Sequence, residues 1–256
     1  MKKQMIKLIC FVGILALSSC RPTYRITNVE GSMTPIDSTW DAHPDTAAAA
    51  LLAPYKAEIG KVMYRVIGTS AMPMEKGRPE SLLSNLVADV LKQAAADVLG
   101  HPADVGLVNM GGLRANLPAG NITINDIYEI CPFENALCVL TLTGSEMKRF
   151  CEDMARVGGP GVSGVKLTIT KDGRLVDATV GGRPIDEART YTVGTIDYLA
   201  EGNDGMTTLM NITRKQCPDD SVLRDLFIRY VEKETAAGRQ ITSRIEGRVT
   251  VVDNEQ

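Results

Sequence analysis

The sequence predicts an α+β domain whose strands pair mainly in the antiparallel direction. Apolar residues recur at helical spacing over residues 82–98, which is typical of a buried helix. Two β-rich segments, 165–170 and 175–180, flank an Asp-Gly pair, a strong hairpin signal. Helices and strands do not alternate regularly, as a βαβ series would require. With 256 residues, 44% of them hydrophobic, the chain can bury the core of one such domain.

The first 19 residues have the features of an export signal. Lysines precede or interrupt the start of an apolar run over residues 8–17, which is too short to span a bilayer. The run ends in Leu-Ser-Ser-Cys, which resembles a bacterial lipobox and predicts cleavage before Cys20 and lipidation of its sulfur. Several acyl chains on one cysteine would anchor the protein stably. We therefore expect a lipoprotein of the bacterial cell envelope, on the periplasmic or outer-membrane face. An ordinary signal peptide with an incidental cysteine is the alternative.

Residues 20–45 are polar and interrupted by prolines, which predicts a tether, with a possible strand at 24–29. The domain is expected over residues 46–253. Asp45 should cap an alanine-rich helix that starts at residue 46, breaks near Pro54 and ends near Gly60. A β-rich stretch at 62–67 predicts the first strand of the domain.

The remaining elements follow from periodicity and turn signals. Gly100 should stop the helix of residues 82–98, and the Asp-Gly pair should form a type I′ turn. A helix over 145–157 should bury Met147, Phe150, Cys151 and Met154. Further strands are predicted at 105–109, 136–142, 191–196 and 247–252, and a further helix at 221–233.

Charge and cysteine content limit the possible partners. The formal net charge is −3 with no basic face, so we do not expect a nucleic-acid partner. Besides Cys10 and Cys20, the chain has four cysteines, none in CxxC spacing, and no zinc site is predicted. Two disulfides in any of three pairings are possible, and buried free thiols are equally compatible with the pattern. These cysteines are Cys131, Cys138, Cys151 and Cys217.

Two glycine-rich stretches could form a ligand site. In residues 109–135 a glycine pair, which lets a backbone approach a ligand closely, precedes Arg114, whose forked donors suit an anion. Phe133 follows as a possible stacking face. In residues 197–205, which follow a strand, Gly202, Asn203 and Gly205 tolerate left-handed backbone and could present Asp204. Each stretch alone is better explained as an ordinary turn.

Together the stretches resemble the substrate-binding, C-terminal domain of the 5′-nucleotidase and UDP-sugar hydrolase family. The family patterns are N-x-G-G-[IL]-R, P-F-x-N and [YF]-x-x-x-G-G-D-G, with a helix E-[ST]-x-x-G-N-L-x-x-D. The matching positions here are Asn109 to Arg114, Pro132 to Asn135, Tyr198 to Gly205, and Glu80 to Asp89. The resemblance covers residues 46–253 and implies a layered α/β/β/α domain with mixed sheets. Asn203 and Ser84 stand where the family has glycines.

The resemblance also implies roles for particular side chains. Phe133 and Tyr198 would sandwich a nucleobase, each stack contributing ~1–3 kcal/mol, although core packing is the alternative for both. Asp204 would accept hydrogen bonds from ribose hydroxyls. Arg114 would bind the phosphate, with Asn109 and the closely approaching Gly112 fixing sugar or phosphate. Arg78 stands one residue later than a family arginine and is a further phosphate candidate.

The family's full enzymes also carry an N-terminal metallophosphatase domain that holds two divalent metals. The only histidines here are His43 and His101, and neither D-x-H nor G-N-H-[DE] occurs. We therefore expect no metal ligands and no catalytic residues on this chain, and place both metals on a separately encoded metallophosphatase partner. The leading hypothesis is the nucleotide-recognition half of a split 5′-nucleotidase, inactive alone. A stand-alone nucleoside- or nucleotide-binding lipoprotein and a remnant that binds nothing are the alternatives.

Overall fold

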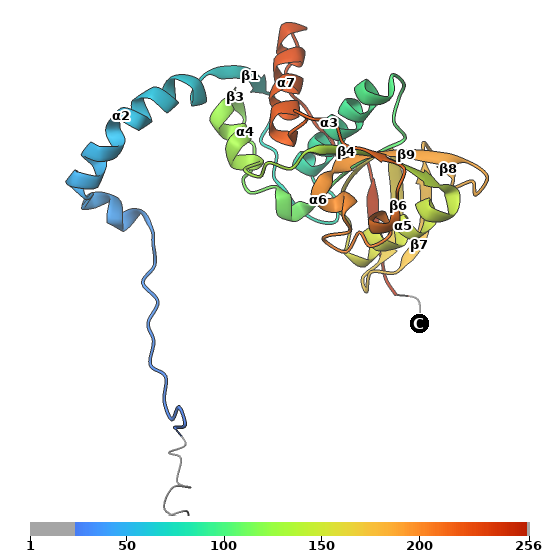
Figure 1. The fold of residues 1–256 in the computed structure, drawn as a ribbon, viewed down its shortest axis with the longest axis horizontal. Helices are drawn as coiled ribbons and strands as arrows, with labels where there is room; N and C mark the ends of the chain where they lie inside the picture. The colour runs from blue at the N-terminus through green and yellow to red at the C-terminus, as the bar shows by residue number, and fades with distance from the viewer. Residues whose placement is uncertain (1–23, 255–256) are drawn as a thin grey trace, which may run out of the picture. The chain divides into compact units, whose positions relative to one another are not determined.

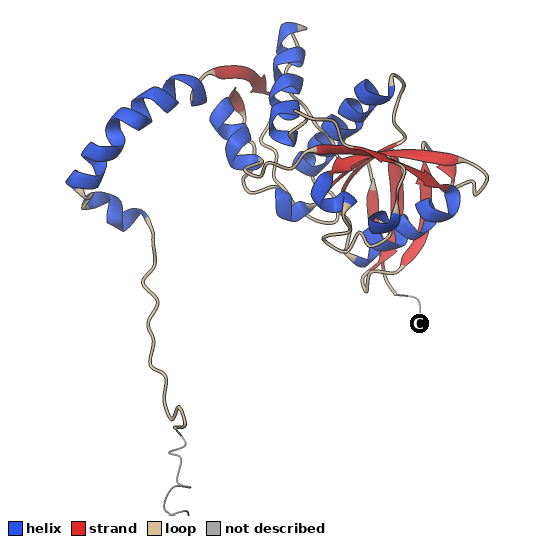
Figure 2. Ribbon diagram, viewed as in Figure 1, coloured by secondary structure: helices blue, strands red, loops and turns tan. Residues whose placement is uncertain are grey.

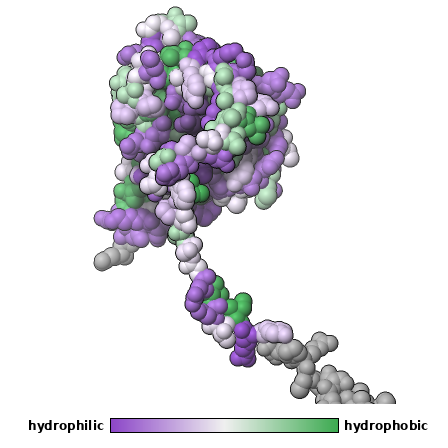
Figure 3. Space-filling model, turned by 90° about the vertical axis from the view of Figure 1, so that its left-hand side faces the viewer, coloured by the Kyte–Doolittle hydropathy of each residue, from purple (hydrophilic) through white to green (hydrophobic). Residues whose placement is uncertain are grey.

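The computed structural model describes residues 24–254, so the leader and Cys20 lie outside the described part of the chain (Figure 1). The chain divides into two units between Leu52 and Ala53. Among residues 24–254 no helix is both long and apolar enough to cross a bilayer. On the face of the molecule shown in Figure 3, hydrophobic side chains are scattered among hydrophilic ones.

Between residues 24 and 45 the chain forms one short helix. The strand expected at 24–29 is wrong: these residues form no regular structure, and side chains such as Ile26 are exposed. A strand needs a neighbouring strand to satisfy its backbone hydrogen bonds and packing partners to cover its apolar face. Among the described residues, this segment has no strand partner and its apolar side chains are not covered. From residue 24 onward, the first regular element is the 3₁₀ helix η1 (Ser38–Ala42), whose N-cap is Asp37.

Helix α2 (Thr46–Met63) starts as predicted but does not stop where predicted. Asp45 caps it, with Oδ1 accepting from the backbone N–H groups of Ala47 at 2.9 Å and Ala48 at 3.0 Å. The expected break at Pro54 and end at Gly60 are wrong. Proline removes one helical hydrogen bond, but the carbonyl that loses its partner belongs to exposed Ala50, where water can replace the donor.

Two mixed sheets form the body of the domain (Figure 2). The five-stranded sheet has the order β10-β4-β9-β2-β5, and only β2 and β9 are parallel. Its strands are β2 (Val105–Val108), β4 (Leu137–Thr143), β5 (Gly161–Ser163), β9 (Thr190–Ile196) and β10 (Lys215–Gln216). The four-stranded sheet has the order β11-β6-β7-β8, with β11 parallel to β6. Its strands are β6 (Val165–Thr170), β7 (Leu175–Val180), β8 (Arg183–Pro184) and β11 (Val249–Val252). The predicted α+β class with mixed sheets is confirmed.

A separate pair, β1 (Val66–Ser70) and β3 (Gly120–Thr123), is antiparallel. The first strand was predicted four residues too early, because α2 continues through residues 62 and 63. Strand β1 begins where Val66 pairs with Thr123. The short helix α4 (Ile124–Ile130) follows β3 and was not predicted, although Ile124, Ile127 and Ile130 are buried at near-helical spacing.

Helix α3 (Leu82–Leu99) packs against β2, β5 and β9 of the five-stranded sheet. Its predicted buried stripe is confirmed, and Gly100 ends it with φ 71°. The helix approaches the sheet closely at Gly106, where an added Cβ would lie 2.2 Å from the carbonyl oxygen of Ala88. This contact explains why a glycine interrupts the apolar strand β2.

The helix motif of residues 80–89 holds the C-terminal part of the chain. The carboxylate of Glu80 accepts from the backbone N–H groups of Glu246 and Arg248, both at 2.8 Å. Asp89 forms two hydrogen bonds of 2.9 Å with the guanidinium of Arg248. Asn85 donates to Glu80 at 2.6 Å and to the carbonyl of Arg244 at 2.9 Å. These polar residues therefore fix the segment that leads into β11, so their role in this structure is to stabilise the fold.

Helix α5 (Gly144–Arg156) contacts strands of both sheets. Its predicted inward side chains, Met147, Phe150, Cys151 and Met154, are all fully buried. The hairpin β6–β7 is also confirmed, but its turn is not type I′, because only Gly173 has a positive φ (83°). Asp172 instead accepts a hydrogen bond from the hydroxyl of Thr170.

The later elements include α6 (Asp197–Ala200) and the predicted helix α7 (Leu223–Ala236). One disulfide, between Cys138 and Cys217, is present among the described residues. Cys131 and Cys151 are free and buried, and burial raises the pKa of each thiol to about 12. The chain therefore contains both a disulfide and buried free thiols, the two arrangements that the sequence left open.

Candidate functional site

Two of the candidate segments leave neighbouring parallel strands. Strand β2 ends at Val108, directly before Asn109, and β9 ends at Ile196, two residues before Tyr198. The strands are parallel, with Val105 opposite Val193, so their carboxyl ends lie at the same edge of the sheet. The segments that carry Asn109 and Tyr198 therefore start side by side.

The third segment reaches the same edge from the other direction. Strand β4 is antiparallel to β9, and its first residue, Leu137, pairs with Ile196. Phe133 and Asn135 precede β4 directly and so arrive next to Tyr198. Pairing between strands far apart in sequence thus brings the three motifs together.

The three segments enclose a cavity of about 330 Å³. It is lined by Asn109, Gly111, Gly112, Phe133, Asn135, Tyr198 and Asp204. Five predicted site residues are among them, whereas Gly111 and Asn135 belonged to the sequence motifs but had been given no role. Phe133 and Tyr198 are 48% and 40% exposed, whereas the core side chain of Phe150 is fully buried. This exposure argues against core packing for the two aromatics and leaves their surfaces available to a ligand.

Both carboxylate oxygens of Asp204 accept a hydrogen bond from a neighbouring side chain. Asn109 Nδ2 donates to Oδ2 at 2.6 Å, and the Tyr198 hydroxyl donates to Oδ1 at 3.1 Å. The bond to Asp204 raises the pKa of Tyr198, which keeps the phenol protonated as a donor. The carboxylate is therefore fixed at the cavity wall, between an amide and an aromatic residue.

The loop that presents Asp204 differs in detail from expectation. Asp204 itself has a left-handed backbone with φ 49°, while Asn203, which was expected to adopt this conformation, does not. Asn203 instead donates from Nδ2 to the carbonyl of Tyr198 at 2.9 Å. Aspartate tolerates left-handed backbone because of its short polar side chain. The tight loop is therefore closed by the Asn203 side chain together with its backbone carbonyl, which accepts from the N–H of Met206 at 3.1 Å.

Gly112 allows the close packing that positions Asn109. A Cβ at Gly112 would lie only 2.6 Å from Oδ1 of Asn109. Asn109 is 8% exposed, and this oxygen is buried with no hydrogen-bond partner in the described part of the chain. The Asn109 amide is therefore located by its bond to Asp204 and by the absence of a side chain at Gly112.

The two arginines predicted for phosphate lie outside this cavity. Arg114 is exposed, and its Nη1 lies 3.4 Å from the carbonyl oxygen of Gly111. Its backbone N–H donates to Ile130 at 2.8 Å, which fixes the start of the side chain near the site. The guanidinium of Arg114 therefore extends from the rim toward solvent.

Arg78 lines a second cavity of about 330 Å³, which shares Asn109, Gly111 and Asp204 with the first. Its guanidinium donates to the carbonyl oxygens of Val157 and Gly159. Burial lowers the pKa of Arg78, and the nearby carboxylate of Asp204 acts in the opposite direction. Both bonds come from Nη1, so Arg78 holds a neighbouring loop through one nitrogen, and a phosphate would compete with two backbone acceptors at that nitrogen.

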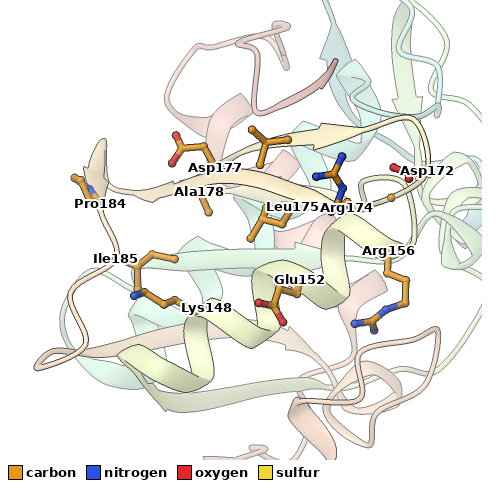
Figure 4. Close-up of a pocket in the computed structure, with 12 residues that line it drawn as sticks. Lys148, Glu152, Arg156, Asp172, Arg174, Leu175, Asp177, Ala178, Pro184 and Ile185 are labelled. Atoms are coloured by element: carbon orange, nitrogen blue, oxygen red, sulfur yellow. The ribbon is translucent and has the colours of Figure 1, made fainter. Parts of the chain in front are cut away.

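A larger open groove of about 740 Å³ lies elsewhere, between α5 and the strands β7 and β8 (Figure 4). Lys148, Glu152 and Arg156 extend from α5 on one side of it, opposite Arg174 and Asp177. Its charges are mixed, and it contains none of the motif residues. We therefore centre the candidate site on the smaller cavity. Within residues 24–254, no group of three or more His, Cys, Asp or Glu side chains is arranged to hold a metal.

The fold is that of an α+β domain, and its candidate site is a cavity lined by an aromatic pair and a fixed carboxylate. A family model described as the C-terminal domain of 5′-nucleotidase matches residues 61–211, which is more than half of the chain. The chain therefore belongs to the 5′-nucleotidase C-terminal domain family. The ligand roles of its individual residues stay predictions.

Relatives with this domain are longer proteins. The chain is 30% identical over 220 residues to NAD 5′-nucleotidase of Haemophilus influenzae, covering 74% of this chain and 36% of that protein. It is 27% identical over 241 residues to the trifunctional nucleotide phosphoesterase YfkN of Bacillus subtilis, covering 86% and 16% respectively. The structure of a 5′-nucleotidase precursor from Thermus thermophilus superposes with a TM-score of 0.71 at 26% identity, covering 84% of this chain and 45% of that one. The chain thus spans less than half the length of these relatives.

Proposed function

We propose that this chain is the nucleotide-recognition half of a split 5′-nucleotidase. The observation that carries the proposal is the 330 Å³ cavity, which sets two exposed aromatics beside a doubly held carboxylate. A nucleoside presents a flat base and two adjacent hydroxyls, and this cavity has a complementary group for each. Family membership supports the same ligand class, because the related proteins are named as nucleotidases.

The chain's own residues would bind and orient the substrate. Phe133 and Tyr198 would stack on the base, each contributing ~1–3 kcal/mol with little preference among bases. Asp204 would accept from the ribose hydroxyls, since each carboxylate oxygen keeps a lone pair beyond the bonds described above. Exposed Arg114 would bind the phosphate by charge-assisted bonds at the rim. The phosphate would then face outward, where a second protein can reach it.

Hydrolysis is assigned in this proposal to a separately encoded metallophosphatase. Two divalent metals held by that partner would activate the attacking water and stabilise the leaving oxygen. This chain would contribute orientation, which converts a bimolecular encounter into a positioned reaction. A lipid on Cys20 would retain the assembly at the bacterial cell envelope and raise the local concentration of the two proteins.

The proposal is tested by binding and activity measurements on the purified chain. We expect AMP to bind in calorimetry, and AMP hydrolysis to appear only after addition of divalent metal and a metallophosphatase encoded beside the gene. Strong metal-dependent hydrolysis by the isolated chain would contradict the split arrangement. AMP binding with no metallophosphatase able to act on the complex would favour a stand-alone binding lipoprotein. No binding of AMP or adenosine would exclude both functions.

A further inference from the structure

The residue expected to stack on the base sits at a weakly held point of the chain. On one side, the backbone N–H of Cys131 donates to Ile127 at 2.9 Å. On the other, the carbonyl of Asn135 accepts from Leu223 at 2.9 Å. Between them, neither Phe133 nor Glu134 has a backbone hydrogen bond to any residue within 24–254. The position of the Phe133 ring therefore depends on side-chain contacts to this tip, residues 132–134.

One side chain contacts this tip from another element. Arg224, in the first turn of α7, places Nη1 3.4 Å from the carbonyl oxygen of Pro132. Its Nη2 lies 3.8 Å from the carboxylate of Glu134. The guanidinium carbon lies 4.1 Å from the ring centroid of Tyr128 on α4, within cation–π range. Arg224 thus connects the tip to α7, which carries this arginine, and to α4, which carries Tyr128.

The surroundings of Arg224 are poorly explained by fold stability alone. Its side chain is only 11% exposed, and its Nε is buried without a partner in the described part of the chain. Burying a guanidinium is costly unless it is well paired. The carboxylate of Glu134 is 84% exposed and more than a hydrogen-bond length away. This ion pair therefore offsets little of the free-energy cost of burying the guanidinium. A positional role accounts better for this arginine.

We propose that Arg224 is a positioning residue that fixes Phe133 in the geometry needed to stack on the nucleobase. This inference rests on the proposed nucleotide-binding function. The planar guanidinium lies against Tyr128 and offers separate nitrogens to Pro132 and Glu134, which an ammonium cannot do from one position. Preorganising the tip removes part of the ordering cost that base binding would otherwise include.

The test compares Arg224→Met with a matched variant, Arg229→Met, on the exposed part of the same helix. The contacts of Arg224 are long, so the dissociation constant of AMP should rise about fivefold in Arg224→Met. Ribose 5-phosphate, which has no base, should bind as it does to the wild type. Arg224→Lys should recover part of the loss, and Arg229→Met should change neither ligand. With an active metallophosphatase complex, KM should rise while kcat is unchanged.

A double variant separates positioning from a general structural effect. In a Phe133→Ala background the ring is absent, so adding Arg224→Met should cause no further loss of AMP affinity. Additive losses, or equal weakening of ribose 5-phosphate, would overturn the inference. So would unchanged AMP affinity in Arg224→Met while Phe133→Ala weakens it, and that result would leave the proposed function standing. A wild-type chain that binds no nucleotide would instead end the proposed function itself.

Discussion

Replacing Phe133 with alanine separates base stacking from the rest of ligand recognition. Phe133 is 48% exposed, so loss of its ring removes little buried surface, and the free energy of unfolding should fall by less than about 1 kcal/mol. Stacking of a base on an aromatic side chain contributes ~1–3 kcal/mol. The dissociation constant of AMP should therefore rise between about fivefold and about 150-fold.

The measurement is calorimetric titration of the purified chain with AMP, adenosine and ribose 5-phosphate. Phe133→Ala should weaken the first two ligands by similar factors and leave ribose 5-phosphate unchanged. Tyr64→Ala is the matched control, because this tyrosine is 69% exposed and lies outside the cavity. The reasoning is refuted if AMP affinity survives the loss of the Phe133 ring, or if ribose 5-phosphate weakens equally.

Two further predictions concern packing at the site and in the core. Gly112→Ala would place a Cβ against Asn109 Oδ1 and disturb its bond to the carboxylate, so AMP should bind about tenfold more weakly. Gly77→Ala, where a Cβ meets nothing closer than 3.7 Å, should have no effect in the same titration. Burial raises the pKa of Cys131 and Cys151 to about 12. Mass spectrometry should therefore find both unalkylated by iodoacetamide at pH 8 until the chain is denatured. By linkage, their contribution to unfolding free energy should fall as pH rises above about 8.5, the unfolded thiol value.

The sequence predicts buried elements better than exposed ones. The buried faces of α3 and α5 follow from apolar spacing, because core packing and local preference agree there. No residue of α2 is buried, so burial gives no signal for its end, and the expected stops at Pro54 and Gly60 were wrong. The short helix α4 shows the opposite error, since its apolar spacing was present in the sequence but covers only seven residues.

The motifs predict most of the residues that line the candidate site, but they do not predict its geometry, which depends on contacts between residues far apart in sequence. Each motif visibly adjoins a strand, but the sequence does not show that β2 pairs with β9 and β9 with β4. Arg78 was a phosphate candidate, yet its guanidinium is engaged by carbonyls about 80 positions away. Arg224 belongs to no motif, and nothing local distinguishes it from the exposed Arg229 on the same helix.

The hydroxyl of Tyr198 provides a test of how the carboxylate recognises ribose. Tyr198→Phe keeps the ring for stacking but removes the donor 3.1 Å from Asp204 Oδ1. Among the side chains of residues 24–254, Asn109 alone would then hold the carboxylate. AMP should then bind about twofold to fivefold more weakly. A 2′,3′-dideoxy analogue has no hydroxyls to donate, so it should bind Tyr198→Phe and wild type equally.

The comparison of the two ligands isolates the carboxylate, because any change in stacking affects both. Tyr64→Phe is the control, since it also loses a phenol hydroxyl but lies outside the cavity and forms no hydrogen bond with Asp204. Equal weakening of AMP and the dideoxy analogue in Tyr198→Phe would show that the hydroxyl acts through the ring position. In that case orientation of Asp204 would have to come from Asn109 alone, and Gly112→Ala should abolish the discrimination between the two ligands.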